Sequence, residues 1–235
     1  MPTTRARRRE DVTARVLQIA RAHLAEHGAA GLSLRAVTRD LGMVSSAVYR
    51  YVANRDELLT LLLVDAYTAQ ADAVQAAVES AADERWSERV LRAAHAFRAW
   101  AVAEPSRYAL LYGSPVPGYS APPEVTVEPG TRVIGILLGL VAEGVARGDV
   151  PDRPAPHDPP EPLAEDLRRV GEEVGLAGHP AVLSRSLLLW SMVVGGTSLE
   201  VFGQYGSDTF RQPEQAYDQQ VRMVLDVLRG GLDPG

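Results

Sequence analysis

The sequence predicts an all-α fold, because apolar side chains recur at helical spacing along most of its 235 residues. Glycine and proline fall between these periodic segments, where they end or begin helices. Only residues 125–127 alternate in the manner of a strand, and they lie in a proline-rich stretch. We therefore predict a small three-helix domain at residues 10–56, joined by a long helix to a helical bundle at 57–235. A flexible basic arm is expected at residues 1–9.

The first helix is predicted from an apolar stripe near the N-terminus. Val12, Val16, Ile19 and His23 follow one another at intervals of four, three and four residues. Such side chains share one face of a helix. Gly28 is typical of the position just beyond a helix, because glycine adopts the left-handed backbone conformation without strain. The first helix is therefore expected to end there.

Two short helices and the start of a long one follow. Ser33 can cap a second helix, and Gly42 then breaks the chain. A third helix is predicted at about residues 45–51. Asn54, with Glu57 three residues later, resembles a capping box that opens a long fourth helix.

The rest of the chain consists of helical segments separated by proline-rich connections. Residues 115–123 and 151–162 are rich in proline, which does not continue a regular helix. Between and around them, helices are predicted at about residues 85–104, 105–112, 129–148, 162–175, 179–204 and 213–230.

Charge is distributed unevenly along the chain. Residues 1–55 hold ten arginines against four acidic residues, whereas residues 56–235 hold fourteen arginines against 26 acidic residues. A basic end on an acidic body indicates that one end of the molecule meets a polyanion. Nucleic acid is the obvious candidate.

The composition also limits the cellular compartment in which the protein can work and the kinds of covalent and metal chemistry open to it. The chain has no cysteine, which excludes disulfides and thiolate metal sites and fits a reducing cytoplasm. No signal-peptide core follows the basic N-terminus. The longest uncharged apolar stretch, residues 187–199, is shorter than the roughly 20 residues of a membrane-spanning helix. We expect a cytoplasmic protein that spans no membrane and needs no metal or other cofactor.

The basic region contains a helix-turn-helix pattern. Residues 32–59, LSLRAVTRDLGMVSSAVYRYVANRDELL, place an amphipathic helix, a glycine turn and a short second helix in sequence. The second helix of such a pair lies in the major groove of DNA. There an arginine can donate two hydrogen bonds to a guanine edge, and an alanine can contact a thymine methyl group. The predicted base-reading residues are Ser45, Ser46, Ala47 and Arg50.

This run resembles the DNA-binding signature of the TetR/AcrR family of transcription regulators, with the apolar positions, the glycine turn and Tyr49 in register. The resemblance implies that Tyr49 and Arg55 bind DNA phosphates. Backbone N–H groups at Ser33 and Leu34, where the second helix starts, are expected to assist. Arg55 stands where the family usually has lysine. Tyr51 is a candidate for core packing as much as for DNA contact.

The resemblance also implies the partners. A member of this family is expected to bind double-stranded operator DNA as a homodimer, to respond to a small-molecule effector, and to act as a repressor. A two-fold dimer doubles the number of base pairs that one short recognition helix can read. The alternative is an architectural DNA-binding protein that needs no ligand.

A long apolar segment suits subunit pairing. Residues 180–204 carry only two charged side chains, Arg185 and Glu200, so this helix is expected to be covered on nearly every side. It has two apolar stripes, one for its own domain and one for a second subunit. The last helix repeats the spacing, which suits an intersubunit four-helix bundle. A purely intrachain core is the alternative. The predicted interface residues are Leu183, Leu187, Val194, Val201, Tyr217, Val221, Val224 and Leu228.

Aromatic side chains in the C-terminal half are candidates for an effector pocket. Residues 98–119 and 190–196 resemble the ligand-binding domain of one branch of the family, in which histidine often stands at the position of Val194. His95 and Arg98 share one predicted helix and can supply polar specificity. For each of these side chains taken singly, core packing is the favoured explanation. The predicted effector-binding residues are His95, Trp100, Tyr108, Leu111, Tyr112, Tyr119, Trp190 and Met192.

An enzyme alternative comes from His23, Glu26 and His27, which match the H-x-x-E-H pattern of zinc hydrolases. The pattern places two imidazoles one helical turn apart. Packing at the end of the first helix accounts for the same residues, and no third ligand group is evident. We therefore expect a protein that is not an enzyme.

Overall fold

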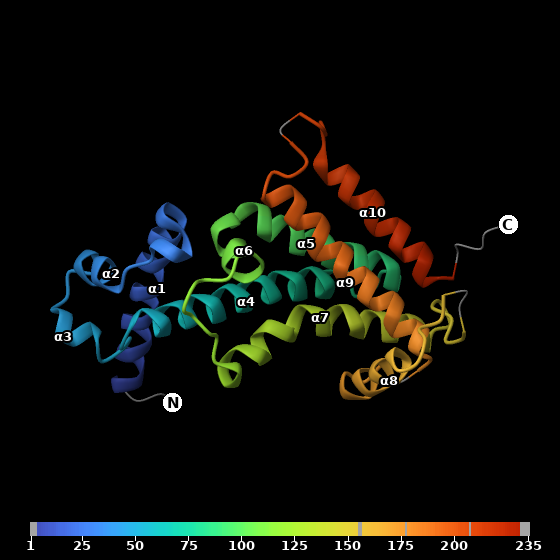
Figure 1. Cartoon of the computed structure of the whole chain (residues 1–235), viewed down its shortest axis with the longest axis horizontal. Helices are drawn as coiled ribbons and strands as arrows, with labels where there is room; N and C mark the ends of the chain where they lie inside the picture. The colour runs from blue at the N-terminus through green and yellow to red at the C-terminus, as the bar shows by residue number, and fades with distance from the viewer. Residues whose placement is uncertain (1–3, 155–156, 177, 207, 231–235) are drawn as a thin grey trace. The chain divides into compact units, whose positions relative to one another are not determined.

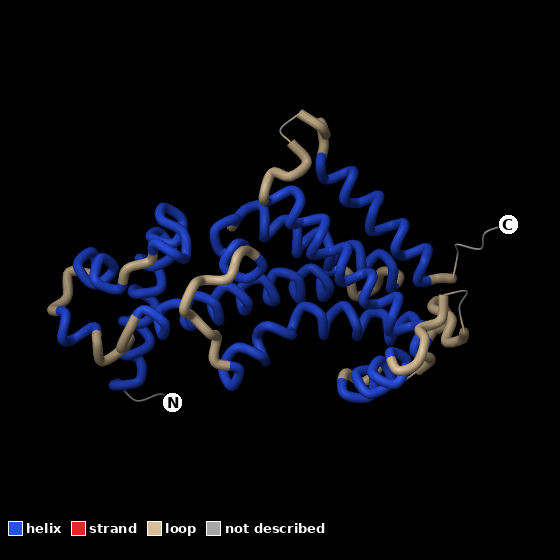
Figure 2. The backbone as a smooth tube through the Cα atoms, in the orientation of Figure 1, coloured by secondary structure: helices blue, strands red, loops and turns tan. Residues whose placement is uncertain are grey.

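The computed structural model describes residues 4–154, 157–176, 178–206 and 208–230; the side chains of residues 4–6, 8, 9, 45 and 46 lie outside this description. Every regular element within these ranges is a helix, as Figure 2 shows. The all-α prediction is therefore confirmed. The chain divides into two compact units, the first from residues 1–69 and 104–130 and the second from residues 70–103 and 131–235.

Helix α1 (Thr4–Gly31) opens the first unit (Figure 1). It starts at Thr4, so the backbone of residues 4–9, within the segment predicted as a flexible arm, is helical. Gly28 interrupts the regular helix with φ 67°, a conformation that glycine adopts because it has no Cβ. The predicted break at Gly28 is confirmed, and one further turn follows it.

Helices α2 (Leu34–Asp40) and α3 (Ser45–Val48) follow in the predicted order. The Ser33 hydroxyl caps α2 by accepting a hydrogen bond from the backbone N–H of Ala36 at 3.4 Å. Gly42 turns the chain with φ 67°. Helix α3 is shorter than predicted, so that residues 49–51 lie in the turn that follows it.

Helix α4 (Arg55–Ser80) begins at a capping box. The side-chain oxygen of Asn54 accepts a hydrogen bond from the backbone N–H of Glu57 at 2.9 Å. In return, the Glu57 carboxylate accepts one from the backbone N–H of Ala53 at 2.6 Å. Each side chain thus satisfies a backbone donor that the helix leaves free, and the predicted capping box is confirmed.

A distant part of the chain completes the first unit. Helix α6 (Pro105–Tyr112) packs against α1, and the first turns of α7 (Pro123–Ala146) belong to the same unit. Val116 and Tyr119 pack against the core that α1 to α4 form. The sequence placed residues 104–130 in the C-terminal domain, because periodicity reports local structure and not this return of the chain.

Helix α9 (Pro180–Val201) is central to the second unit. It contacts α5 (Trp86–Ala103), α8 (Leu163–Glu173) and α10 (Pro213–Leu228). These bounds agree with the predicted helices to within a few residues. Helix α7 starts about six residues before its predicted position, at a proline, whose fixed φ suits the first turn of a helix.

Helices α7 and α9 are long and apolar enough to cross a membrane by length and composition alone. The core helix of a soluble protein passes the same test. Because α5, α8 and α10 all pack against α9, we interpret α9 as a core helix.

Candidate nucleic-acid interface and polar cleft

The surface around α3 presents the residues predicted to read DNA. Val48 is fully buried and anchors the short helix in the core of the first unit, while Ala47 is half-buried. Tyr49 is 43 % exposed, and Arg50 is exposed beside it. The side chains of Ser45 and Ser46 lie outside the described ones. The structure therefore leaves an aromatic hydroxyl and a guanidinium facing solvent directly after α3.

Tyr51 lies differently from Tyr49. It is partly buried and packs against the hydrophobic core of the first unit. Of the two interpretations of Tyr51 that the sequence leaves open, the structure supports core packing.

Arg55, the first residue of α4, is half-buried and donates hydrogen bonds to backbone carbonyl groups. Its Nε donates to the carbonyl oxygen of Leu32 at 3.0 Å. Its Nη2 donates to the carbonyl oxygens of Ala29 at 2.9 Å and Ala30 at 3.1 Å. This guanidinium, which the family resemblance assigned to DNA phosphate, thus binds the end of α1 instead of facing solvent freely.

The histidines of the zinc-hydrolase pattern also have a structural explanation. His23 is 9 % exposed, and its Nε2 lies 2.7 Å from a carboxylate oxygen of Asp40, which ties α1 to α2. The hydrogen bond from His23 is the main cause that lowers the pKa of Asp40, with Arg39 assisting. The ring of His27 meets that of His23 edge-on at 5.7 Å. Among the described residues, no group of three metal-binding side chains occurs.

The predicted effector residues fall into both units. Tyr108, Leu111, Tyr112 and Tyr119 belong to the first unit. The ring of Tyr108 is fully buried and lies 4.9 Å from that of Tyr112, whose phenol has its pKa raised by burial. The hydroxyl of Tyr119 lies 2.9 Å from that of Thr60. These contacts describe aromatic packing within the first unit.

The other predicted effector residues, His95, Trp100, Trp190 and Met192, belong to the second unit. Trp190 packs edge-on against the buried ring of Phe97 at 6.0 Å. His95 is different, because it lines an open cleft.

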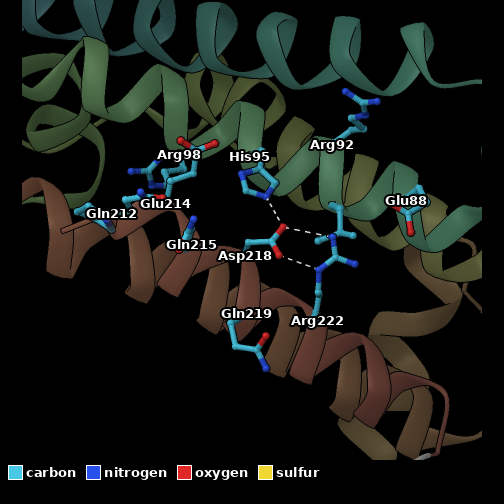
Figure 3. A pocket seen from close by; sticks show the side chains of 12 residues that line it. Glu88, Arg92, His95, Arg98, Gln212, Glu214, Gln215, Asp218, Gln219 and Arg222 are labelled. Atoms are coloured by element: carbon cyan, nitrogen blue, oxygen red, sulfur yellow. Dashed lines mark hydrogen bonds and ion pairs between the residues drawn. The ribbon is translucent and has the colours of Figure 1, made fainter. Parts of the chain in front are cut away.

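The cleft lies between α5 and α10 and has a volume of about 1160 Å³ (Figure 3). On its floor, Nε2 of His95 lies 2.9 Å from a carboxylate oxygen of Asp218, and the other carboxylate oxygen accepts a hydrogen bond from Nε of Arg222 at 2.7 Å. The hydrogen bond from Arg222 is the largest cause that lowers the pKa of Asp218, with His95 contributing less. Three glutamines of the α10 side, Gln212, Gln215 and Gln219, complete one wall.

Arg98 sits at the end of the cleft and is held rigidly. It forms two hydrogen bonds to the carboxylate of Glu200 on α9, at 2.6 and 2.5 Å. Its guanidinium carbon lies 5.9 Å from the centre of the Tyr217 ring. The sequence suggested Arg98 as a polar partner of His95, but the pairing with Glu200 needs the packing of α5 on α9 and has no local signal.

The structure changes the residues available for an interface between subunits. Five of the predicted interface residues are buried within the single chain and so offer no free surface: Leu183, Tyr217, Val221, Val224 and Leu228. Val194 and Val201 are half-buried, and Leu187 is exposed. The buried face of α9 is centred on Val182, Ser186, Leu189 and Val193.

The buried face of α9 thus lies one residue, or about 100°, from the stripe predicted to pair subunits. The opposite side of α9 stays exposed. It carries Leu188 and Leu199, and on α10 the side chain of Met223 is also exposed.

A buried helix-turn-helix core whose short second helix is followed by two exposed side chains, Tyr49 and Arg50, in a chain that also holds a larger helical unit, is typical of DNA-binding regulators of the helix-turn-helix class. Comparisons with known proteins specify the family. Residues 90–224 match the family described as "Tetracyclin repressor-like, C-terminal domain". The chain is 50 % identical over 220 residues to the HTH-type transcriptional regulators Rv1816 of Mycobacterium tuberculosis and Mb1846 of Mycobacterium bovis, covering 94 % of this chain and 93 % of each relative. The chain therefore belongs to the TetR family of transcription regulators.

Solved structures agree with this assignment. The crystal structure of the protein SCO4313 is 32 % identical and superposes with a TM-score of 0.74, covering 95 % of this chain and 99 % of the other. A regulatory protein of the TetR family from Rhodococcus RHA1, 17 % identical, shares the fold with a TM-score of 0.61 over 92 % of this chain and 96 % of its own. As a member of this family, the chain is a DNA-binding transcription regulator and not an enzyme.

Proposed function

We propose that this regulator is a cytoplasmic repressor that binds a palindromic operator as a homodimer and is modulated by a small-molecule effector. Family membership supports the overall scheme. The observation that carries the dimer is an apolar stripe on α9 and α10 that one chain leaves exposed.

We define the stripe as the exposed side chains of Leu188 and Leu199 on α9 and of Met223 on α10, together with the half-buried Gly195 on α9. Leu199 is 39 % exposed and Met223 is 51 % exposed. In the described part of the chain, nothing lies within 4 Å of where a Cβ on Gly195 would stand, so a second helix can approach closely there. Pairing two such stripes about a two-fold axis removes apolar surface from water in both subunits.

The surface that carries Ala47, Tyr49 and Arg50, here called the reading surface, is proposed to bind one half of the operator in each subunit. Arg50 is exposed and has no acidic partner among the described residues, which leaves its guanidinium available for a guanine edge. Tyr49 is proposed to bind phosphate, and Ala47 with the serines before it to lie along the base edges. Backbone N–H groups at Ser33 and Leu34 add phosphate contacts at the start of α2.

The effector is proposed to bind in the polar cleft between α5 and α10. The cleft offers donors and acceptors of both signs around His95 and Asp218, which favours a polar or charged molecule. Helix α10 contributes one face to the cleft and another to the apolar stripe. A ligand that alters the packing of α10 against α5 can therefore shift the population of dimer arrangements. The aromatic effector residues predicted from the sequence stay a prediction.

Binding to DNA can be tested with a labelled duplex from the region upstream of the chain's own gene. Fluorescence anisotropy at 50 to 200 mM salt is expected to show affinity that falls steeply with salt, at two chains per duplex. The proposal fails if no duplex is bound in a salt-dependent manner. Binding of one chain per duplex would retain DNA recognition and exclude the homodimer.

Effector binding can be tested by thermal unfolding across a panel of polar metabolites. One compound is expected to raise the unfolding temperature strongly, because a ligand of the folded state stabilises it by mass action. His95→Ala should abolish that shift, whereas Arg85→Ala, at an exposed arginine outside the floor of the cleft, should retain it. Small and uniform responses to the whole panel would support the ligand-independent architectural alternative.

A further inference from the structure

Arg55 links the start of α4 to the end of α1 and to the connection between α1 and α2. It is the first residue of α4, and it donates hydrogen bonds at 2.9 to 3.1 Å to the carbonyl oxygens of Ala29, Ala30 and Leu32. Ala29 and Ala30 belong to the last turn of α1. Leu32 directly precedes Ser33, the residue that caps α2. One side chain therefore fixes the end of α1 and the residue before the α2 cap against the start of α4.

Of the carbonyl groups that Arg55 binds, that of Ala29 also accepts a long hydrogen bond from the backbone N–H of Leu32, at 3.4 Å. Gly28, with φ 67°, interrupts the regular helix of α1, and the chain leaves the helix after Gly31. Carbonyl groups at the end of a helix have no intrahelical N–H partner, and they carry the negative end of the helix dipole. A cationic side chain with several donors satisfies both conditions at once.

The arrangement uses the particular shape of arginine. The guanidinium is planar and presents donors along separate edges, so Nε and Nη2 reach different carbonyl oxygens simultaneously. A lysine ammonium is a compact point charge on a flexible stem and does not reproduce this fork. Lysine, however, binds a phosphate well. Exchange of arginine for lysine at position 55 should therefore impair a residue that binds several carbonyl oxygens, but not a residue that binds a DNA phosphate.

We propose that Arg55 is a positioning residue that sets the helix-turn-helix for DNA binding and is not itself a phosphate ligand. This inference rests on the proposed DNA binding of the chain. It reassigns the residue that the family resemblance places on the phosphate backbone. The guanidinium, unlike a lysine ammonium, can reach the carbonyl oxygens of Ala29, Ala30 and Leu32 at once.

The test compares Arg55→Lys and Arg55→Ala with the wild type, and uses Arg85→Ala as the control for loss of one exposed positive charge. Operator affinity is measured between 50 and 200 mM salt, and the unfolding temperature is measured without DNA. We expect Arg55→Lys and Arg55→Ala both to bind about tenfold more weakly. The slope of log affinity against log salt should stay that of the wild type, because no phosphate contact is lost.

A phosphate ligand would behave in the opposite way. Arg55→Lys would then bind like the wild type, and Arg55→Ala would reduce the salt slope by about 0.9. Either result overturns the proposal. If Arg55→Ala does not fold, Arg55→Lys still distinguishes a positioning residue from a phosphate ligand. It keeps the positive charge and replaces only the planar guanidinium with its several donors.

The unfolding temperature separates this inference from the proposed function. If the wild type binds no duplex, the proposed function fails, yet a lower unfolding temperature of Arg55→Lys relative to Arg85→Ala still supports the link between α1, the α1–α2 connection and α4. An unchanged unfolding temperature together with unchanged affinity contradicts it.

Discussion

In the described part of the chain, exposed arginines without an acidic partner are common around the helix-turn-helix, although Arg21 and Arg107 of the first unit pair with Asp65. Around the helix-turn-helix, several arginines are exposed and have no acidic partner among the described residues: Arg7, Arg15, Arg35 and Arg50. In the second unit, arginines join helices by pairing with carboxylates, as in Arg89 with Glu143, Arg98 with Glu200 and Arg132 with Asp72. Unmatched positive charge attracts a polyanion, whereas matched charge stabilises packing. The uneven charge of the sequence thus reflects two uses of the same residue type.

The change with the largest expected effect disrupts the apolar stripe of the second unit. The proposed dimer forms through this stripe, and tight operator binding depends on the dimer. Leu199→Asp places a charge on the stripe and should convert the dimer into monomers. Operator affinity is then expected to fall by more than about 100-fold, since two linked half-sites bind far more tightly than one. Sedimentation and anisotropy measure the two effects.

Leu163→Asp is the matched control for this change, because Leu163 is an exposed leucine on α8, 47 % exposed against 39 % for Leu199. It should leave both the dimer and the operator affinity unchanged. A Leu199→Asp protein that remains dimeric would place the interface elsewhere.

A second change tests the arginine that pairs inside the second unit. The side chains of Arg98 and Glu200 are only 12 % and 16 % exposed. Arg98→Met leaves the Glu200 carboxylate largely buried without its cation, so the free energy of unfolding should fall by about 3 kcal/mol. Urea unfolding measures this loss.

Arg222→Met provides the comparison for the buried pair. Arg222 pairs with Asp218 at the surface, and loss of such an exposed pair costs less than about 1 kcal/mol. Equal losses for the two variants would show that burial does not distinguish these ion pairs.

The third change tests the unmatched arginine of the reading surface. Arg50→Ala should reduce the preference for the operator over a scrambled duplex by about 1–3 kcal/mol, because a bidentate contact to guanine is lost. Thermal stability should not change, since Arg50 is exposed and has no acidic partner within the described residues. Arg85→Ala should leave the preference intact, and a retained preference in Arg50→Ala would move base recognition to other residues.

The smallest expected effect is a pH dependence of stability at Asp218. Its neighbours Arg222 and His95 hold the pKa of this carboxyl below its ordinary value of 3.8. The folded state therefore binds the proton less readily than the unfolded state. The resulting stabilisation is present above the ordinary pKa and is lost as the pH falls through the lowered one.

The measurement compares urea unfolding of the wild type and Asp218→Asn at pH 6 and below pH 4. The wild type should lose more stability on acidification than the variant. A parallel loss in both proteins would mean that the ion pair does not contribute. Asp40, beside His23 in the first unit, has a pKa lowered in the same direction and serves as an independent site for the same comparison.

The predictions that the structure confirms are those that depend on neighbours in the sequence. Gly28 ends a helical run, Ser33 caps α2, and Asn54 with Glu57 opens α4. Each signal acts within four residues, so the chain carries it wherever the segment packs. The predicted base-reading and effector residues stay predictions, because they depend on partners outside the chain.

By itself, the sequence determined the helices, their order and the basic reading region, because capping, periodicity and charge are properties of short segments. Only the tertiary structure decided which side of α9 is buried, since this nearly uncharged helix has several apolar faces and the face centred on Val182, Ser186, Leu189 and Val193 is the buried one. It also decided the partners of Arg55, which lie 23 to 26 residues away in the chain. Such contacts depend on how helices meet, and no local pattern encodes them.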